Sequence, residues 1–106
     1  MDYTKPFKFL KNLPPKLNSF YNKRSSSGVK VSNKSKTKKD FDPVTNFDRA
    51  FEKYIRSLIN KKFPKDSIIG EEFEDKFSSN NLKWSIDPID GTRAFVIGAP
   101  TWSNLI

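Results

Sequence analysis

A strongly amphipathic helix is the feature of this sequence that most limits how the chain can fold. Apolar side chains recur at steps of three and four residues over residues 45–62, which places them on one side of a helix. These side chains are Phe47, Phe51, Tyr54, Ile55, Leu58 and Ile59. Thr45 is a suitable N-cap with Asp48 three residues later as a partial capping box, and Pro43 and Pro64 bound the run. The pattern therefore predicts a helix over residues 45–62.

Shorter elements are expected on both sides of this helix. Prolines at positions 6, 14 and 15 predict an irregular start, and a short helix is expected to begin at Pro14-Pro15 and to end at residues 25–28. Apolar runs predict strands at 29–32, 67–70 and 82–86, and polar stretches predict loops at 33–40 and 74–81. The apolar segments 95–97 and 102–106 are interpreted as two strands or as one bent strand.

The composition excludes several kinds of chemistry. The chain has 106 residues with no Cys and no His, which leaves out disulfide scaffolds, Cys-ligated zinc sites, thiol nucleophiles and histidine bases. The length suits one small domain or a piece of a larger one. No apolar run approaches the roughly 20 residues of a membrane span, and the N-terminus lacks a signal pattern, so we expect a cytoplasmic protein without membrane contact.

The excess of positive charge lies in the N-terminal part of the chain. Residues 1–40 hold eleven Lys and Arg against two acidic residues, whereas residues 41–106 hold nine basic and ten acidic residues. A basic arm with interleaved aromatic side chains can bind nucleic acid through phosphate contacts and base stacking. The aromatic candidates are Phe7, Phe9, Phe20 and Tyr21. Because no nucleic-acid recognition motif is present, we favour a solvated N-terminal segment.

Acidic residues follow two of the predicted strands. Glu71 and Glu72 come directly after one strand, and Asp87 and Asp90 end the next. Neighbouring strand ends would bring these carboxylates together, and carboxylates that lie close to one another need a counter-charge. Mg²⁺ supplies such a charge and prefers oxygen ligands, to which the carbonyl group of Ile89 could add one more.

The residues after this acidic pair suit an anion and a water molecule. Gly91-Thr92 resembles the start of a helical turn, whose free backbone N–H groups favour a phosphate, and the Thr92 hydroxyl can orient a water. Metal ions beside a phosphate suggest hydrolysis by a metal-activated water. Asp, Pro and Gly also form ordinary turns, and a Glu-Glu pair is usually solvated. From the residues alone, a metal site and a set of surface turns both stay open.

Three motifs occur in a familiar order along the chain. They are Asp42-Pro43-Val44-Thr45-Asn46-Phe47-Asp48, Ile69-Gly70-Glu71-Glu72, and Trp84-Ser85-Ile86-Asp87-Pro88-Ile89-Asp90-Gly91-Thr92-Arg93-Ala94-Phe95-Val96-Ile97-Gly98-Ala99-Pro100. With these motifs the chain resembles the inositol monophosphatase superfamily of magnesium-dependent sugar and polyol phosphatases. The resemblance covers residues 29–106, and residues 1–28 match only as a generic first helix. It implies two parts, a basic N-terminal segment (1–28) and the N-terminal part of a catalytic domain (29–106).

The resemblance also implies a fold class and a metal site. The fold would be α+β, the N-terminal part of a layered α-β-α-β-α sugar-phosphatase fold with helices packed on a mostly antiparallel sheet. The cofactor would be Mg²⁺. Glu71, Asp87 and the carbonyl of Ile89 would hold a first ion, and Asp87 and Asp90 would share a second. Glu71 and Thr92 would position the attacking water.

Further site residues follow from the same resemblance. The phosphate would be held at Asp90, Gly91, Thr92 and Arg93, with the backbone N–H groups of the last three as donors. Asp48, counted among the catalytic residues, would support the water and metal region together with Thr45 and Glu72. Either Lys36 or Lys39 would match a lysine that precedes the family's Asp-Pro-Val-Thr motif.

The substrate and the extent of the protein are expectations of the same kind. Gly91-Thr92-Arg93-Ala94-Phe95 resembles the histidinol-phosphate phosphatase branch, so we rank histidinol phosphate first and inositol monophosphate second. The family carries another metal-ligating Asp in a Trp-Asp-x-Ala-Ala motif, and this chain stops at Ile106 before such a motif. We therefore expect an N-terminal fragment, poorly soluble and inactive alone, of a protein that is a homodimer at full length. The alternatives are a non-catalytic basic module and an inert truncated product.

Overall fold

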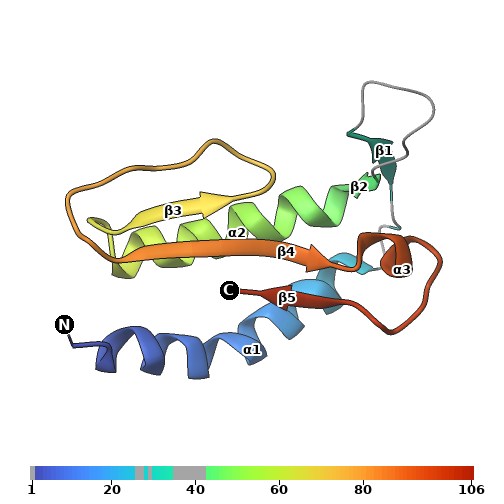
Figure 1. The fold of residues 1–106 in the computed structure, drawn as a ribbon. Helices are drawn as coiled ribbons and strands as arrows, with labels where there is room; N and C mark the ends of the chain where they lie inside the picture. Colours follow the sequence, from blue (N-terminus) through green and yellow to red (C-terminus); the bar gives the residue numbers. More distant parts are fainter. Residues whose placement is uncertain (1, 26–27, 29, 35–42) are drawn as a thin grey trace.

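A computed structural model describes residues 2–25, 28, 30–34 and 43–106 of the chain (Figure 1). Its elements, in chain order, are α1 (Thr4–Arg24), β1 (Val31–Asn33), β2 (Pro43–Thr45), α2 (Asn46–Lys62), β3 (Ser67–Gly70), β4 (Lys83–Asp90), α3 (Thr92–Val96) and β5 (Ser103–Leu105). Strands β3, β4 and β5 form a sheet in that order, with β3 parallel and β5 antiparallel to β4. Strands β1 and β2 form a separate antiparallel pair. The α+β class is confirmed.

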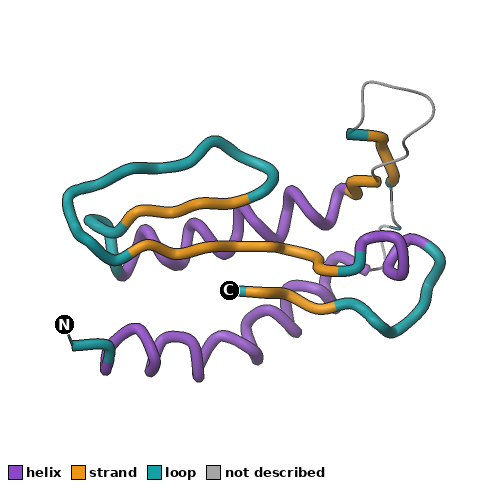
Figure 2. Tube along the Cα trace, in the orientation of Figure 1, coloured by secondary structure: helices purple, strands orange, loops and turns teal. Residues whose placement is uncertain are grey.

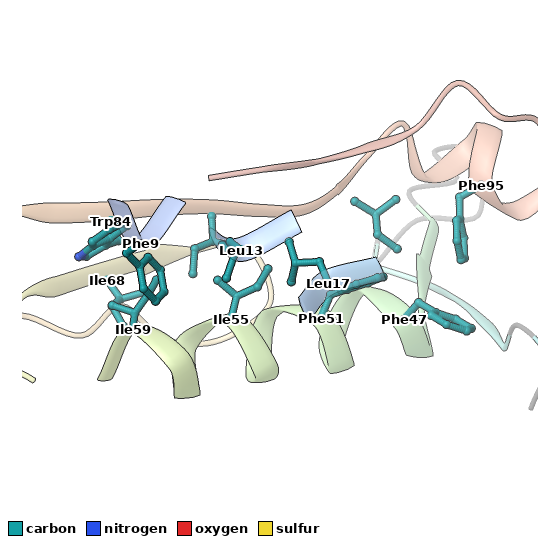
Figure 3. Close-up of a cluster of buried hydrophobic side chains, with 12 residues drawn as sticks. Phe9, Leu13, Leu17, Phe47, Phe51, Ile55, Ile59, Ile68, Trp84 and Phe95 are labelled. Atoms are coloured by element: carbon teal, nitrogen blue, oxygen red, sulfur yellow. The ribbon is translucent and has the colours of Figure 1, made fainter. Parts of the chain in front are cut away.

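The two long helices and the sheet share one hydrophobic core. Figure 2 shows α1 and α2 running alongside the sheet, and Figure 3 shows side chains of α2 packed against those of α1, β3 and β4. The buried apolar residues are Phe9, Leu13, Leu17, Phe47, Phe51, Ile55, Ile59, Ile68, Trp84, Ile86, Ile89 and Phe95. Four of them come from α2 at helical spacing, so the apolar stripe predicted for this helix is the one that packs.

The expectation of an irregular first segment is wrong, because α1 starts at Thr4 and contains both Pro14 and Pro15. A proline within a helix removes a hydrogen bond and disfavours the helix by about 3 kcal/mol relative to alanine. Here both prolines are exposed, while Phe9 and Leu13 on the other face are buried in the core. Tertiary packing of this face therefore outweighs the local preference.

Most of the aromatic side chains of α1 that could have stacked on bases pack against other parts of the protein instead. Phe9 is buried against Trp84, with ring centroids 5.4 Å apart. Phe20 stacks on Tyr54 of α2 at 4.5 Å. Phe7 is exposed. The lysines of α1 lie on the solvent side, but the expectation of a solvated segment is wrong for the opposite face of the helix, which is buried in the core. None of the helices in the described part of the chain is both long and apolar enough to cross a membrane.

Helix α2 begins as its sequence predicts. The Thr45 hydroxyl accepts hydrogen bonds from the N–H groups of Phe47 and Asp48 at 3.1 and 3.2 Å. The Asp48 carboxylate accepts the N–H of Thr45 in return, at 2.6 Å, which completes the capping box. The helix ends at Lys62, before Pro64. Its N-terminus is thereby fixed beside the end of β4.

The C-terminal elements differ in part from the expectation. Strand β4 continues four residues beyond the predicted end at Ile86, to Asp90. Segment 95–97 is not a strand, because Phe95 and Val96 belong to α3. Strand β5 lies inside the predicted segment 102–106. In the N-terminal half, β1 starts at Val31 rather than at residue 29, which lies outside the described residues, as does most of the predicted loop 33–40.

We expect the cap to stabilise the chain through its hydroxyl group. Thr45→Ala should lower the free energy of unfolding by about 1–2 kcal/mol, because it removes the cap. Thr45→Ser keeps the hydroxyl and should retain most of that stability. Urea unfolding followed by circular dichroism measures both variants. Equal losses in the two variants would show that the methyl group matters and the cap does not.

Candidate functional site

The sheet brings the predicted carboxylates to one edge. Strands β3 and β4 are parallel, and Gly70 pairs with Ile86 in their register. Glu71 follows the last residue of β3 and lies next to Asp87, from which β4 continues to Asp90. Asp90 ends β4 and is exposed. The expectation that adjacent strand ends gather these acidic residues therefore agrees with the topology.

Thr92 joins this edge to helix α2. Its hydroxyl lies 3.2 Å from the Asp48 Oδ1 atom and 3.0 Å from the carbonyl oxygen of Ile89. The second oxygen of Asp48 accepts hydrogen bonds from the N–H and the hydroxyl group of Thr45, at 2.6 and 2.7 Å. Asp48 and Thr45 are both buried, so the position of the Thr92 hydroxyl is set by a fully bonded buried carboxylate.

Asp87 lies in an unfavourable electrostatic environment. Its Oδ1 atom is buried and has no hydrogen-bond partner among the described residues. Burial raises the pKa of the Asp87 carboxyl, and the carboxylates of Asp90 and Asp48 raise it further. An unpartnered buried oxygen among like charges is a place where a cation lowers the free energy.

Glu71 faces the same acidic environment from the end of β3. Burial raises the pKa of its carboxyl, and repulsion from Asp87 adds to the shift, while Lys34 acts in the opposite direction. Its side chain is 54% exposed. A carboxylate that is open to solvent and repelled by its neighbours is suited to bind a cation that enters from solution.

Glu72 is buried rather than solvated, and it pairs with a lysine that the motifs did not single out. Only 4% of its side chain is exposed, and Lys34 Nζ lies 3.2 Å from its Oε1 atom. The same ammonium group is 4.0 Å from Glu71. Lys36 and Lys39, the predicted candidates for this region, lie outside the described residues.

The predicted phosphate-binding residues surround the start of α3. Gly91 has a positive φ of 86° and caps the helix, and Thr92 and Arg93 form its first turn. A Cβ atom at Gly91 would lie 2.9 Å from the carbonyl oxygen of Thr101, so both the conformation and the space require glycine. Backbone N–H groups point out of the N-terminal end of such a turn, which favours an anion there.

The acidic residues are neighbours, but their side chains do not form a complete set of metal ligands. Within the part of the chain that the structure describes, no group of three or more acidic side chains is close enough to hold a metal ion. The donor set nevertheless fits Mg²⁺, because it consists of carboxylate and carbonyl oxygens with one orphaned buried oxygen at Asp87. The arrangement can attract a hard cation at the strand ends and an anion at the first turn of α3.

A second set of contacts was missed by reasoning from the motifs. Glu52 of α2 accepts the N–H groups of Glu72 and Phe73 at 2.9 and 3.0 Å. Its only signal in the sequence is a charge one helical turn after Asp48, next to the apolar stripe of α2. Most charges beside such a stripe are solvated, whereas Glu52 is fully buried.

Comparison with known proteins agrees with this geometry. Residues 16–106 match the model of the Inositol monophosphatase family. The chain is 49% identical to the histidinol-phosphatase of Chlorobaculum parvum over 70 residues, which make up 66% of this chain and 27% of that protein. It therefore spans about a quarter of the length of that curated relative.

Solved structures show the same fold. The IMPase of Thermotoga maritima aligns with a TM-score of 0.75 and 33% identity, covering 95% of this chain and 38% of that one. An IMPase/NADP phosphatase complexed with Mg²⁺ and phosphate aligns with a TM-score of 0.69 and 22% identity, covering 92% and 37% of the two chains. At that identity the second likeness concerns the fold alone.

We expect the charge of Asp87 to destabilise the metal-free chain. Asp87→Asn should raise the free energy of unfolding by about 0.5–2 kcal/mol in EDTA, because it relieves repulsion at a partly buried position. Asp75→Asn removes the same charge from an exposed loop position and should change stability by less than about 0.5 kcal/mol. Urea unfolding of the three proteins measures the difference. A less stable Asp87→Asn variant would contradict the electrostatic account.

Proposed function

The chain belongs to the inositol monophosphatase family, and on that premise we propose that it forms part of a magnesium-dependent phosphomonoesterase. The observation that carries the proposal is the meeting of Glu71 and Asp87 just beyond the last paired residues of two parallel strands, Gly70 and Ile86, beside the Thr92–Asp48 hydrogen bond. Glu71 supplies an exposed carboxylate, and Asp87 supplies a partly buried one whose Oδ1 atom has no partner among the described residues. This pair of carboxylates favours a bound cation, whereas a turn with only a structural role does not require such a pair.

We propose that Glu71, Asp87, Asp90 and the carbonyl oxygen of Ile89 hold the metal. The Ile89 carbonyl oxygen lies 3.0 Å from the Thr92 hydroxyl, and it keeps lone pairs for a metal ion when that hydroxyl donates its proton to Asp48. Bound Mg²⁺ would supply Lewis-acid chemistry, which lowers the pKa of a coordinated water and neutralises charge on the phosphate. The Mg²⁺ and phosphate found with an IMPase/NADP phosphatase of the same fold support this choice of cofactor.

The residues of the chain itself would orient the reacting groups. The Thr92 hydroxyl has a single proton, which it can donate to Asp48. Its oxygen lone pairs would then be available as acceptors for a water molecule. Glu71 would accept a hydrogen bond from the other O–H group of that water. A lone pair of the water oxygen would then face the phosphorus atom.

The phosphate would lie at the start of α3. The backbone N–H groups of Gly91, Thr92 and Arg93 would donate hydrogen bonds to its oxygens, since the N-terminal end of a helical turn favours negative charge. Asp90 would lie at the same edge and ligate the metal there. Thr45, Asp48 and Glu72 would support the site from the protein interior.

Histidinol phosphate is the substrate that we propose, with inositol monophosphate as the alternative. The ranking rests on the Gly91-Thr92-Arg93-Ala94-Phe95 segment and on the 49% identity to the Chlorobaculum parvum histidinol-phosphatase over 70 residues. The homodimer, the cytoplasmic location and the inactivity of residues 1–106 alone stay predictions.

Loss of one metal ligand should abolish the reaction. Asp87→Asn in the full-length polypeptide that carries residues 1–106 should remove Mg²⁺-dependent phosphate release, because an amide replaces an anionic ligand. Glu74→Gln, a charge change at an exposed position, should leave phosphate release unchanged. Since Asp87→Asn is expected to fold at least as stably as the original, release that persists in this variant would refute the metal site.

The substrate ranking is tested by direct comparison. We expect kcat/KM for histidinol phosphate to exceed that for inositol 1-phosphate by at least about tenfold in the same polypeptide, because a polar pocket discriminates strongly against a substrate that leaves its groups unpaired. Phosphate release with each compound at several concentrations gives both values. The reverse order would make inositol monophosphate the better assignment.

A further inference from the structure

We propose that Glu52 and Arg56 of helix α2 are positioning residues that fix the backbone of Glu71 at the candidate metal site. The proposal rests on the proposed function for what Glu71 does, but the positioning itself can be measured without metal. Neither residue belongs to the motifs that suggest the site.

Glu52 holds the segment after β3 by its backbone. Its side chain is 0% exposed, and each of its oxygens has a separate partner. Oε1 accepts the N–H group of Glu72 at 2.9 Å, and Oε2 accepts that of Phe73 at 3.0 Å. Hydrogen bonds to a buried carboxylate are stronger than those between neutral groups, so these two amides are held firmly.

Arg56 binds both the Glu52 carboxylate and the loop that follows β3. Its Nε atom lies 3.0 Å from Glu52 Oε2, one helical turn earlier on α2. Its two terminal nitrogens donate to the carbonyl oxygens of Glu74 and Phe73, at 2.8 and 3.1 Å. The planar guanidinium group thus binds the carboxylate and the loop backbone together, which a lysine could not do.

The residue before Glu71, Gly70, pairs with Ile86 in the sheet and lies close to the same carboxylate. A Cβ atom at Gly70 would lie 2.6 Å from the Glu52 carboxylate, so glycine is required for the close approach. Glu71 therefore stands between two residues, Gly70 and Glu72, that both contact Glu52. Its backbone is held on each side while its carboxylate stays open to solvent.

The spacing along α2 explains how one helix can align both halves of the site. Asp48, Glu52 and Arg56 occur at intervals of four residues, which places them on one side of the helix. Asp48 binds Thr92 at the end of β4, and Glu52 binds the backbone at the end of β3. The distance between the two strand ends is therefore set against a single rigid element.

A purely stabilising role explains this arrangement less well. A buried ion pair is often no better for stability than a neutral or apolar replacement of similar size, because desolvating both charges is costly. What the pair adds is a fixed geometry for the loop. In metal proteins, removing a group that orients a ligand typically weakens metal binding by about 10- to 100-fold.

Two readouts on the full-length polypeptide that carries residues 1–106 test the proposal. The first is hydrogen–deuterium exchange of residues 71–74 in EDTA, and the second is the Mg²⁺ concentration that gives half of the maximal rise in melting temperature. Glu52→Gln should accelerate the exchange at least about tenfold and raise the Mg²⁺ midpoint by about 10- to 100-fold. Arg56→Lys, at a partly exposed position where folding is less at risk, should shift both in the same direction by smaller factors.

Ile55→Val is the matched control, because it removes one buried methyl group from the same helix. It should lower the melting temperature. Exchange of residues 71–74 and the Mg²⁺ midpoint should both stay within about twofold of the original, since their hydrogen bonds are untouched.

Each outcome decides between a positioning role and a purely stabilising role for Glu52 and Arg56. Unchanged exchange in Glu52→Gln would overturn the positioning role, and so would faster exchange with an unchanged Mg²⁺ midpoint. An original full-length polypeptide whose melting temperature does not respond to Mg²⁺ would contradict the proposed function. In that case the exchange measurement alone would decide whether Glu52 and Arg56 hold the Glu71 segment.

Discussion

The buried carboxylate of Glu52 is the interaction on which the geometry of this chain most depends. It is fully desolvated, yet it has Arg56 and two backbone N–H groups as partners, so its charge is compensated. A buried charge tolerates little displacement, because any lost partner leaves an uncompensated ion. Helix α2 therefore cannot rotate or slide relative to the end of β3 without a large cost. Apolar packing alone would allow more freedom, since it has no preferred direction.

The candidate site combines this rigid support with unfavourable electrostatics. Asp48 has partners for both of its oxygens, whereas Asp87 has an orphaned one and Glu71 is repelled by Asp87. Glu52 and Asp48, which hold the backbone and the Thr92 hydroxyl, have carboxylates whose charges are compensated. Glu71 and Asp87, which lie at the candidate metal site, have carboxylates whose charges are compensated less fully. Such a division is typical of binding sites, where stability is given up at the ligands and recovered in the groups that orient them.

Local sequence signals predicted the parts of the structure that local interactions decide. The periodicity of α2, its Thr45 cap and the break at Pro64 lie within one segment, and the structure confirms them. The start of α1 was mispredicted because burial of Phe9 and Leu13 comes from contacts with distant residues such as Trp84. Segment 95–97 was mispredicted because the helical turn expected at Gly91-Thr92 continues through Val96, and apolar composition does not reveal where such a turn ends.

The same limit explains which site residues could be found from the sequence. Glu71, Asp87 and Thr92 stand in short motifs whose spacing already suggests their chemistry. Glu52 and Lys34 reach their partners across 20 and 38 positions of the chain, so no window of sequence joins them to the site. Residues that touch the reacting groups thus leave a local signature, whereas residues that hold them in place are visible only in the fold. In this chain the support comes from one face of α2, and the apolar stripe that identifies the helix also determines where Asp48 and Glu52 must point.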